Sequence, residues 1–338
     1  MKFGWKGALG ILVSAVCLYF AFHGRFDLAQ AWQQAKHANY FLLLLSTVAA
    51  TCMFPLRARR WRTILDPVAL HLPFGPLWRS TAIGVMMTNV LPARAGEIAR
   101  PYALSREVQE VPFSAALASV AVDRVFDAIV VLLLLGLSMM SSDFPATITI
   151  KERTWHIAYM ARKFAFAPIV LLLGLYALVF FPDALIRVFE WFARRVSRRL
   201  EEKGSEMLRR FSEGLSVLRH PTRFLAVFGW TLLHWLVQPL AFWLGMRAFG
   251  INASWAALLF VQGIIVLAVA VPSSPGFIGV FELSAAAALA AYGIEYNSAL
   301  TWATVFHIAS YIPITLLGAY YFARAGMHMG DVETAARK

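Results

Sequence analysis

Three charged residues spaced by three, Arg94, Glu97 and Arg100, directly follow an apolar run in the stretch NVLPARAGEIARPYAL. If the segment after the proline is helical, the three side chains share one face and pair in sequence, with Glu97 between two guanidiniums. One positive charge is then left over. Arginine grips phosphate or carboxylate with two parallel hydrogen bonds, and a helix that begins near Ala95 adds the partial positive charge of its amide groups. The pattern favours an anion site; the alternative is a cluster that only anchors the turn.

A second charged group lies inside the apolar run VAVDRVFDAIVVLLLLGL. Asp123 and Asp127 are four residues apart, so they share one helix face, and Arg124 lies beside them. Counted from residue 113, the group lies about 15 to 20 Å into the membrane. Charged groups at that depth face an interior or a cavity and are functional by default. The surplus carboxylate can meet the surplus arginine of the first group, bind a cation or carry a proton. The alternative is a structural ion network between helices.

A third group combines the turn VPSSPGFIGVFELS with a histidine further along the chain. Ser274 offers a hydroxyl, Gly276 allows close approach of the backbone, and Glu282 is the counterpart of Glu97. His307 lies inside an apolar run. A lone histidine in a membrane helix is more often a hydrogen-bonded helix contact than a switch, and both interpretations stay open.

The composition is that of a polytopic membrane protein. Of the 338 residues, 59% are hydrophobic and only 15% are charged, which lies far outside the soluble average. The net charge of +12 does not indicate a nucleic-acid partner, because the basic residues gather beside apolar spans, where they set topology and meet anionic headgroups. Cys17 and Cys52 lie in apolar runs and predict neither a disulfide framework nor a metal site.

We therefore expect an all-α fold with about six full transmembrane helices. The charged, apolar N-terminus has no small-x-small cleavage site and is interpreted as an uncleaved first helix. Each predicted span is near the length that crosses a hydrocarbon core. The spans are residues 5–22, 39–56, 113–141, 164–181, 224–247 and 299–322.

Two further apolar regions are too short for simple crossings. Residues 77–91 and 254–271 each stop at a proline-containing turn before a second short helical segment begins. A broken backbone at membrane depth is tolerated only where protein or a wet cavity covers its polar groups. We interpret both regions as re-entrant helical hairpins. The alternative is two pairs of short helices, each joined by a surface loop.

Charge asymmetry sets the predicted orientation. Four arginines after the second span (Arg57, Arg59, Arg60 and Arg62) and a basic segment at 183–223 are expected in the cytoplasm. Residues 23–38 and 142–163 are then external loops. The basic segment also has helical apolar spacing, which indicates amphipathic helices against the inner leaflet, although a solvated loop remains an alternative.

This threading gives the two halves opposite orientations. A span, hairpin, span arrangement repeated upside down is typical of transporters with a substrate site near the midplane. Residues 1–325 form one transmembrane domain and residues 326–338 a cytoplasmic tail in this interpretation. Both termini are expected in the cytoplasm.

The motifs LPARAGEIARPYAL, DRVFD and PSSPGFIGVFE, in this order, resemble the lysylphosphatidylglycerol synthase transmembrane-domain family, also described as flippase-like. The resemblance spans roughly residues 5–325 and lacks the soluble aminoacyl transferase domain of the synthases. It implies movement of lipids across the bilayer rather than lysyl transfer. Two departures concern Phe277, where relatives often have glycine, and His307, where many have arginine. The second implies substrate handling that depends on pH.

The expected function is a lipid translocase of the cytoplasmic membrane. An anionic or glycosylated lipid headgroup would enter a cavity between the hairpins while its chains stay in the bilayer, with proton or cation coupling and possible homo-oligomers. No cofactor, metal or nucleic acid is expected, and no nucleotide-binding glycine-rich loop is present in the sequence. A scaffold for a lipid or glycolipid pathway is one alternative. The other is an intramembrane hydrolase or lipid-modifying transferase that uses Ser273 or Ser274 with His307, or the carboxylates as acid and base.

Overall fold

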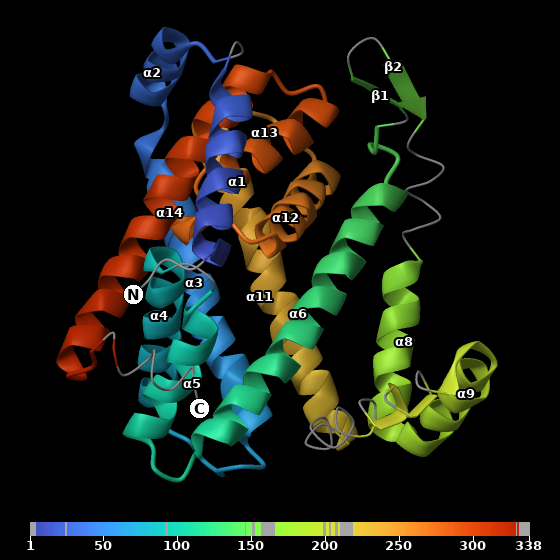
Figure 1. The fold of residues 1–338 in the computed structure, drawn as a ribbon. Coiled ribbons are helices and arrows are strands. Elements are labelled where there is room, and N and C mark those ends of the chain that lie inside the picture. The colour runs from blue at the N-terminus through green and yellow to red at the C-terminus, as the bar shows by residue number, and fades with distance from the viewer. Residues whose placement is uncertain are drawn as a thin grey trace.

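The computed structural model is helical apart from one small β-ribbon (Figure 1). It describes residues 5–23, 26–91, 94–145, 147–150, 153–156, 166–198, 201–202, 204–206, 209, 219–328 and 330. The helices are α1 (Trp5–Phe22), α2 (Leu28–His37), α3 (Tyr40–Leu65), α4 (Phe74–Val90), α5 (Gly96–Glu107), α6 (Phe113–Met140), α8 (Ala167–Phe180), α9 (Pro182–Val196), α11 (Pro221–Ala248), α12 (Trp255–Ala270), α13 (Val280–Ala291) and α14 (Tyr296–Arg324), with a 3-10 turn, η2 (Pro275–Phe277), before α13.

Three of these helices are long and apolar enough to cross a membrane by length and composition. They are α3, α11 and α14, and the bent pair α8–α9 gives a fourth candidate, with 118° between its two helices. Helix α6 is as long as α11 but carries Asp123, Arg124 and Asp127. The chain is therefore a polytopic membrane protein, as predicted, and the full count of six spans stays a prediction.

Polar caps begin several of these helices. Asp27 accepts hydrogen bonds from two backbone amides at the start of α2, and Asn39 does the same for α3. Glu295 caps α14, and Ser254 caps α12. Each cap satisfies amides that have no partner within the helix, which fixes where the helix begins.

Two short helix pairs enter the bundle from opposite ends (Figure 1). The first pair is α4–α5, and the second is α12–α13 with η2 at its tip. The tips meet in the middle, where Arg94 donates a hydrogen bond of 2.8 Å to the carbonyl of Val269 on α12. Tyr311 of α14 donates one of 3.1 Å to the carbonyl of Asn89 near the first tip. The breaks in both pairs therefore lie inside the protein rather than at its ends.

Close packing of α4 on α5 depends on a glycine. A Cβ built on Gly96 falls 1.8 Å from the carbonyl oxygen of Gly84 and 2.2 Å from the hydroxyl of Thr88. No larger residue fits between the two helices at this contact. The close contact between α4 and α5 therefore holds the charged residues of this helix pair in position.

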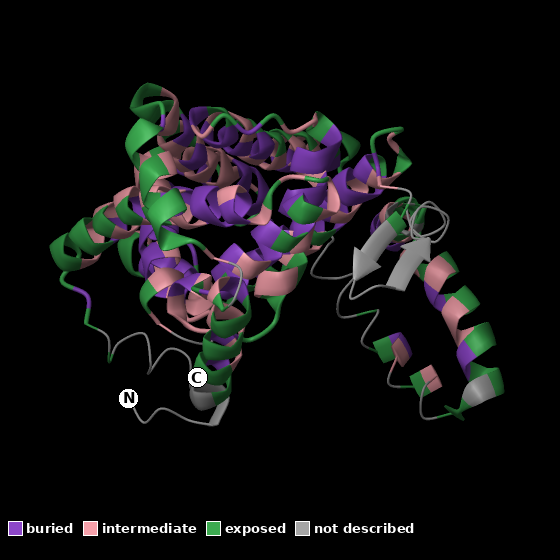
Figure 2. Ribbon diagram, turned by 90° about the horizontal axis from the view of Figure 1, so that it is seen from above, coloured by how far each residue is buried: buried purple, intermediate pink, exposed green. Residues whose placement is uncertain are grey.

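Buried residues gather in the central bundle (Figure 2). The ribbon of β1 (Thr147–Ile150) and β2 (Arg153–His156) is antiparallel and pairs Thr147 with His156. It lies in the 142–163 region, for which we expected a loop; the threonine, isoleucine and tryptophan of the runs TITI and RTWH favour such a ribbon. The 183–223 segment begins with α9, which exposes Val188, Trp191 and Phe192 as an amphipathic helix does. Residues 199–200, 203, 207–208, 210–218 and 331–338 lie outside the described residues.

Candidate functional site: a charged cavity between helix tips

Arg60 lies at the centre of a buried ion cluster. Its side chain on α3 is fully buried, and its two terminal nitrogens each lie 2.6 Å from a carboxylate, Asp123 and Asp127 of α6. The two aspartates thus share one guanidinium, which is possible because their four-residue spacing puts both on the same helix face. Thr231 of α11 lies 3.2 Å from Arg60 and accepts a further hydrogen bond.

Two more arginines approach Asp123 from neighbouring helices. Arg100 of α5 donates to Asp123 at 2.8 Å, and its guanidinium lies 3.9 Å from the ring centre of Trp61. Arg57 of α3 lies 3.7 Å from the same carboxylate. In the described part of the chain, Nε of Arg57 and both Nε and Nη2 of Arg100 have no hydrogen-bond acceptor. These arginines therefore keep buried, unused hydrogen-bond donors beside Asp123.

The first turn pairs differently from our expectation. Arg94 lies 3.6 Å from Glu97, but the second partner of Glu97 is Arg124 at 3.3 Å, because Arg100 turns instead to Asp123. We predicted that Glu97 pairs with both Arg94 and Arg100. The pair with Arg94 is present, but the predicted pair with Arg100 is wrong. α5 begins at Gly96, so Arg94 precedes the helix, as the predicted start near Ala95 requires. Pro92 of the same motif lies outside the described residues.

Asp127 connects the cluster to α11. It accepts a hydrogen bond of 2.8 Å from the indole nitrogen of Trp235 and lies 3.4 Å from Arg124. His234 on α11 lies 4.0 Å from the same carboxylate. Asp127 lies halfway along α6, so the cluster is near the middle of a helix about 40 Å long.

A cavity of about 410 Å³ opens beside this cluster. Its charged lining comes from the first half of the chain: Arg57, Arg94, Glu97, Arg100, Arg124 and Asp127. Its second-half lining from α12 and the η2 tip is apolar: Val266, Val269, Ala270 and Phe277. Two of its lining residues, Ala128 and Ala270, are exposed. The cavity is therefore polar on one wall and apolar on the other.

Charge is not balanced around the cavity. Five guanidiniums (Arg57, Arg60, Arg94, Arg100 and Arg124) face three carboxylates (Glu97, Asp123 and Asp127), which leaves two positive charges among the described residues of the cluster. At membrane depth such a surplus is costly unless an anion or water neutralises it.

The polar residues of the second turn lie elsewhere. Ser274 exchanges hydrogen bonds of 2.8 and 2.9 Å with Ser14 of α1, and Glu282 pairs with His307 at 2.7 Å. Glu282 also accepts the backbone amide of Gly279, which caps α13. Gly276 packs at the tip, where a Cβ would lie 2.8 Å from the ring of Tyr311. None of the four predicted residues of this group is among those that line the cavity in the described structure.

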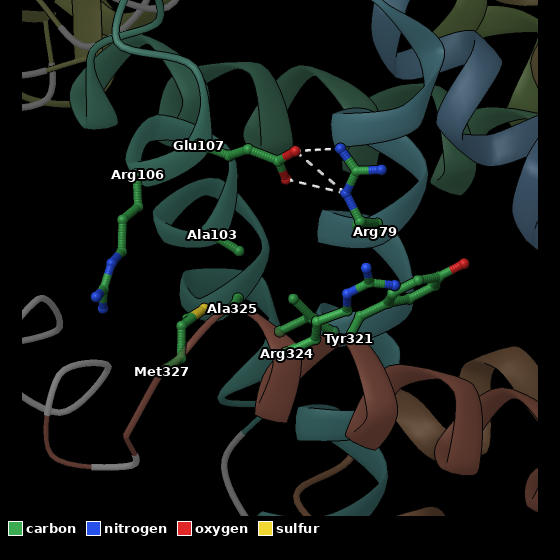
Figure 3. Close-up of a pocket in the computed structure, with 9 residues that line it drawn as sticks. Arg79, Ala103, Arg106, Glu107, Tyr321, Arg324, Ala325 and Met327 are labelled. Atoms are coloured by element: carbon green, nitrogen blue, oxygen red, sulfur yellow. Dashed lines mark hydrogen bonds and ion pairs between the residues drawn. The ribbon is translucent and has the colours of Figure 1, made fainter.

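A second cavity, of about 460 Å³, lies at the end of the bundle where α4 begins and α5 and α14 end. Figure 3 shows Arg79 and Glu107 pointing toward one another across it, with Arg324 beside Tyr321. Its lining shares no residue with the cavity beside the ion cluster. Arg79 is therefore a suitable reference arginine outside the cluster.

Comparison with known proteins places the chain in a family. The sequence model described as the lysylphosphatidylglycerol synthase TM region matches residues 7–318. The chain belongs to this family. A UPF0104 membrane protein of Methanothermobacter thermautotrophicus is 26% identical over 94% of this chain and 93% of its own length. A UPF0104 membrane protein of Methanocaldococcus jannaschii is 24% identical over 70% of this chain and 93% of its own length.

A third relative is longer than this chain. The glycosyltransferase AglD of Haloferax volcanii is 25% identical over 83% of this chain, which corresponds to 48% of its own length. No solved structure matches the chain. The part of the chain that matches the synthase TM family contains the whole charged cluster.

Within this family region, Arg57 and Arg60 are the cluster residues that the sequence did not reveal. We expected both in the cytoplasm as topology-setting charges, but α3 continues to Leu65 and carries them into the protein. Their position inside the protein is possible because the Asp123 carboxylate forms an ion pair with each of them, at 3.7 Å to Arg57 and 2.6 Å to Arg60. Two features of the sequence could have indicated these partners. Arg57 and Arg60 are three residues apart, and α6 was predicted to carry a carboxylate without a partner.

Proposed function

We propose that this protein translocates lipids with a phosphate-bearing headgroup across the cytoplasmic membrane. The observation that carries the proposal is a cavity with two surplus positive charges whose arginines retain unused donors. Phosphate accepts several such hydrogen bonds and supplies the missing negative charge.

The shape of the cavity supports a lipid rather than a free anion. Its polar wall faces an apolar wall, and the exposed residues Ala128 and Ala270 line it, which is where we propose that it opens toward lipid. A headgroup can then enter the cavity while the acyl or prenyl chains remain in the bilayer. In this proposal the two helix pairs are re-entrant hairpins in an inverted repeat, which gate the site alternately from each side.

The proposed movement needs no catalytic step by the protein. The enzyme alternative requires a serine that hydrogen-bonds a histidine base. His307 instead bonds Glu282, and Ser274 bonds Ser14, in the described structure. Neither Ser274 nor Ser273, whose hydroxyl has no hydrogen-bond partner among the described residues, therefore has a histidine base in this structure.

The scaffold alternative draws on one comparison. A protein named glycosyltransferase AglD matches this chain over about half of its own length. A chain that only recruits a glycosyltransferase would tolerate neutralisation of the cavity charges but not of the basic 183–223 segment. Neutralising each set separately distinguishes the two functions.

Leaflet exchange in reconstituted liposomes tests the proposal. Arg94 contributes a charged donor to the cavity, and a hydrogen bond to a charged group contributes about 1.5–3 kcal/mol, so Arg94→Ala is expected to slow exchange of phosphatidylglycerol by about tenfold or more. Arg79→Ala is the matched control, because its partner Glu107 is exposed and lies outside the cavity. Equal rates for wild type and both variants would refute the proposal.

A further inference from the structure

Both helix tips place a non-glycine residue in the left-handed backbone region. Arg94 has φ 53° at the first tip, and Phe277 has φ 60° at the second. Both residues line the cavity of about 410 Å³ beside the ion cluster. A bulky residue in this region is an outlier that persists only where its surroundings demand it, and such residues cluster at ligand clamps and switches.

The surrounding turn holds Phe277 in this conformation. Gly276 and Gly279 also have positive φ, 68° and 86°, so three of four consecutive residues are left-handed. The turn is wedged against the first helix pair: a Cβ on Gly276 would lie 3.4 Å from the carbonyl oxygen of Asn89. The intervening Ile278 has an ordinary φ of −58° and an exposed side chain. Phe277 is therefore the residue of this tip that faces the cavity.

We propose that Phe277 is the specificity-determining residue of the cavity. Its ring limits how large a headgroup can lie between the arginine wall and the second tip. It also closes the cavity toward the end of the molecule where α12 begins and α13 ends. The substrate class is then a phosphate with a small substituent, such as glycerol, rather than a sugar-bearing phosphate. This inference rests on the proposed translocation.

Thiol labelling tests the barrier without any substrate. A cysteine at Val85, on the arginine side of the cavity, is introduced after Cys17→Ser and Cys52→Ser. An impermeant thiol reagent added on the side of residues 142–163 should label it slowly in the otherwise wild-type protein. We expect Phe277→Gly to speed labelling about tenfold, because the barrier is removed and glycine favours the same backbone. Ile278→Gly, in the same turn, should leave the labelling rate unchanged.

Leaflet exchange tests the size limit. The ratio of exchange rates for a glycosylated phospholipid and for phosphatidylglycerol with the same chains should rise about tenfold in Phe277→Gly. The ratio should stay at the wild-type value in Ile278→Gly. Unchanged labelling and an unchanged ratio in Phe277→Gly would overturn the inference. If neither lipid exchanges in wild type, the proposed function fails, and labelling alone decides whether Phe277 is the barrier.

Discussion

At the scale of single residues, the charged cluster depends on Arg60. Among the described residues, only this side chain pairs with both aspartates of α6, and it is fully buried. The types and spacing of Arg94, Glu97, Arg100, Asp123, Arg124 and Asp127 identified most of the cluster from sequence. The partners could not be identified, because Arg100 pairs with Asp123 on α6 rather than with Glu97, and Arg124 pairs with Glu97 on α5 as well as with its neighbour Asp127. Pairing between helices depends on packing that local spacing does not encode.

Arg60→Met should be strongly destabilising. Removing one partner of a buried pair leaves uncompensated charge and costs about 3–5 kcal/mol. Here two aspartates lose their shared partner. Arg59→Met is the control, since Arg59 lies on the same helix and its guanidinium lies 5.5 Å from the ring centre of Trp230. Thermal unfolding in detergent measures the stability of both variants. An equal, small loss of stability in the two would show that the ion pairs of Arg60 contribute little.

At the scale of elements, the sequence predicted helix positions well where apolar runs were uninterrupted. The first predicted span, 5–22, coincides with α1, and 113–141 ends one residue beyond α6. The second span was predicted to end at 56, but α3 continues through Pro55 to Leu65. The arginines end the apolar pattern but not the helix. Arg57 and Arg60 continue it inside the protein because the buried carboxylate of Asp123 pairs with them. Hydropathy cannot detect that compensation.

Gly96→Ala tests whether close packing of α4 on α5 positions the cavity wall. The added methyl group would overlap the Gly84 carbonyl, and relieving such overpacking costs about 1–3 kcal/mol. We expect lower stability and slower lipid exchange. Gly229→Ala in α11 is the control, because nothing lies within 4 Å of its added Cβ. Thermal unfolding and exchange rates of the two variants should therefore differ; matching behaviour would argue against this role of the helix contact.

At the scale of the whole molecule, the two helix pairs are alike in arrangement but not in chemistry. The sequence led us to expect polar groups from both tips in one pocket. The first pair supplies the charges, whereas the second contributes apolar lining and uses Ser274 and Glu282 to bond α1 and α14. Charge bias and chain breaks predict the topology, which stays a prediction. The direction in which each polar side chain turns depended on neighbours far away in sequence.

The predicted orientation has a direct test. Single cysteines are placed at Gln33 in α2 and at Arg187 in α9, both exposed, after replacing Cys17 and Cys52. The positive-inside rule predicts that only the α9 cysteine reacts with an impermeant reagent on the cytoplasmic side. Gln33→Cys should react only from the outside. Labelling of both from one side would contradict the predicted threading.

Headgroup selectivity tests the central claim most directly. Exchange rates are measured for a phosphatidylglycerol and for a lipid with the same chains and a neutral headgroup of equal size that lacks the phosphate. Because the cavity carries surplus positive charge, wild type should exchange the phosphate lipid at least about tenfold faster, and Arg94→Ala should reduce that preference. Equal rates for the two lipids in wild type would contradict the account.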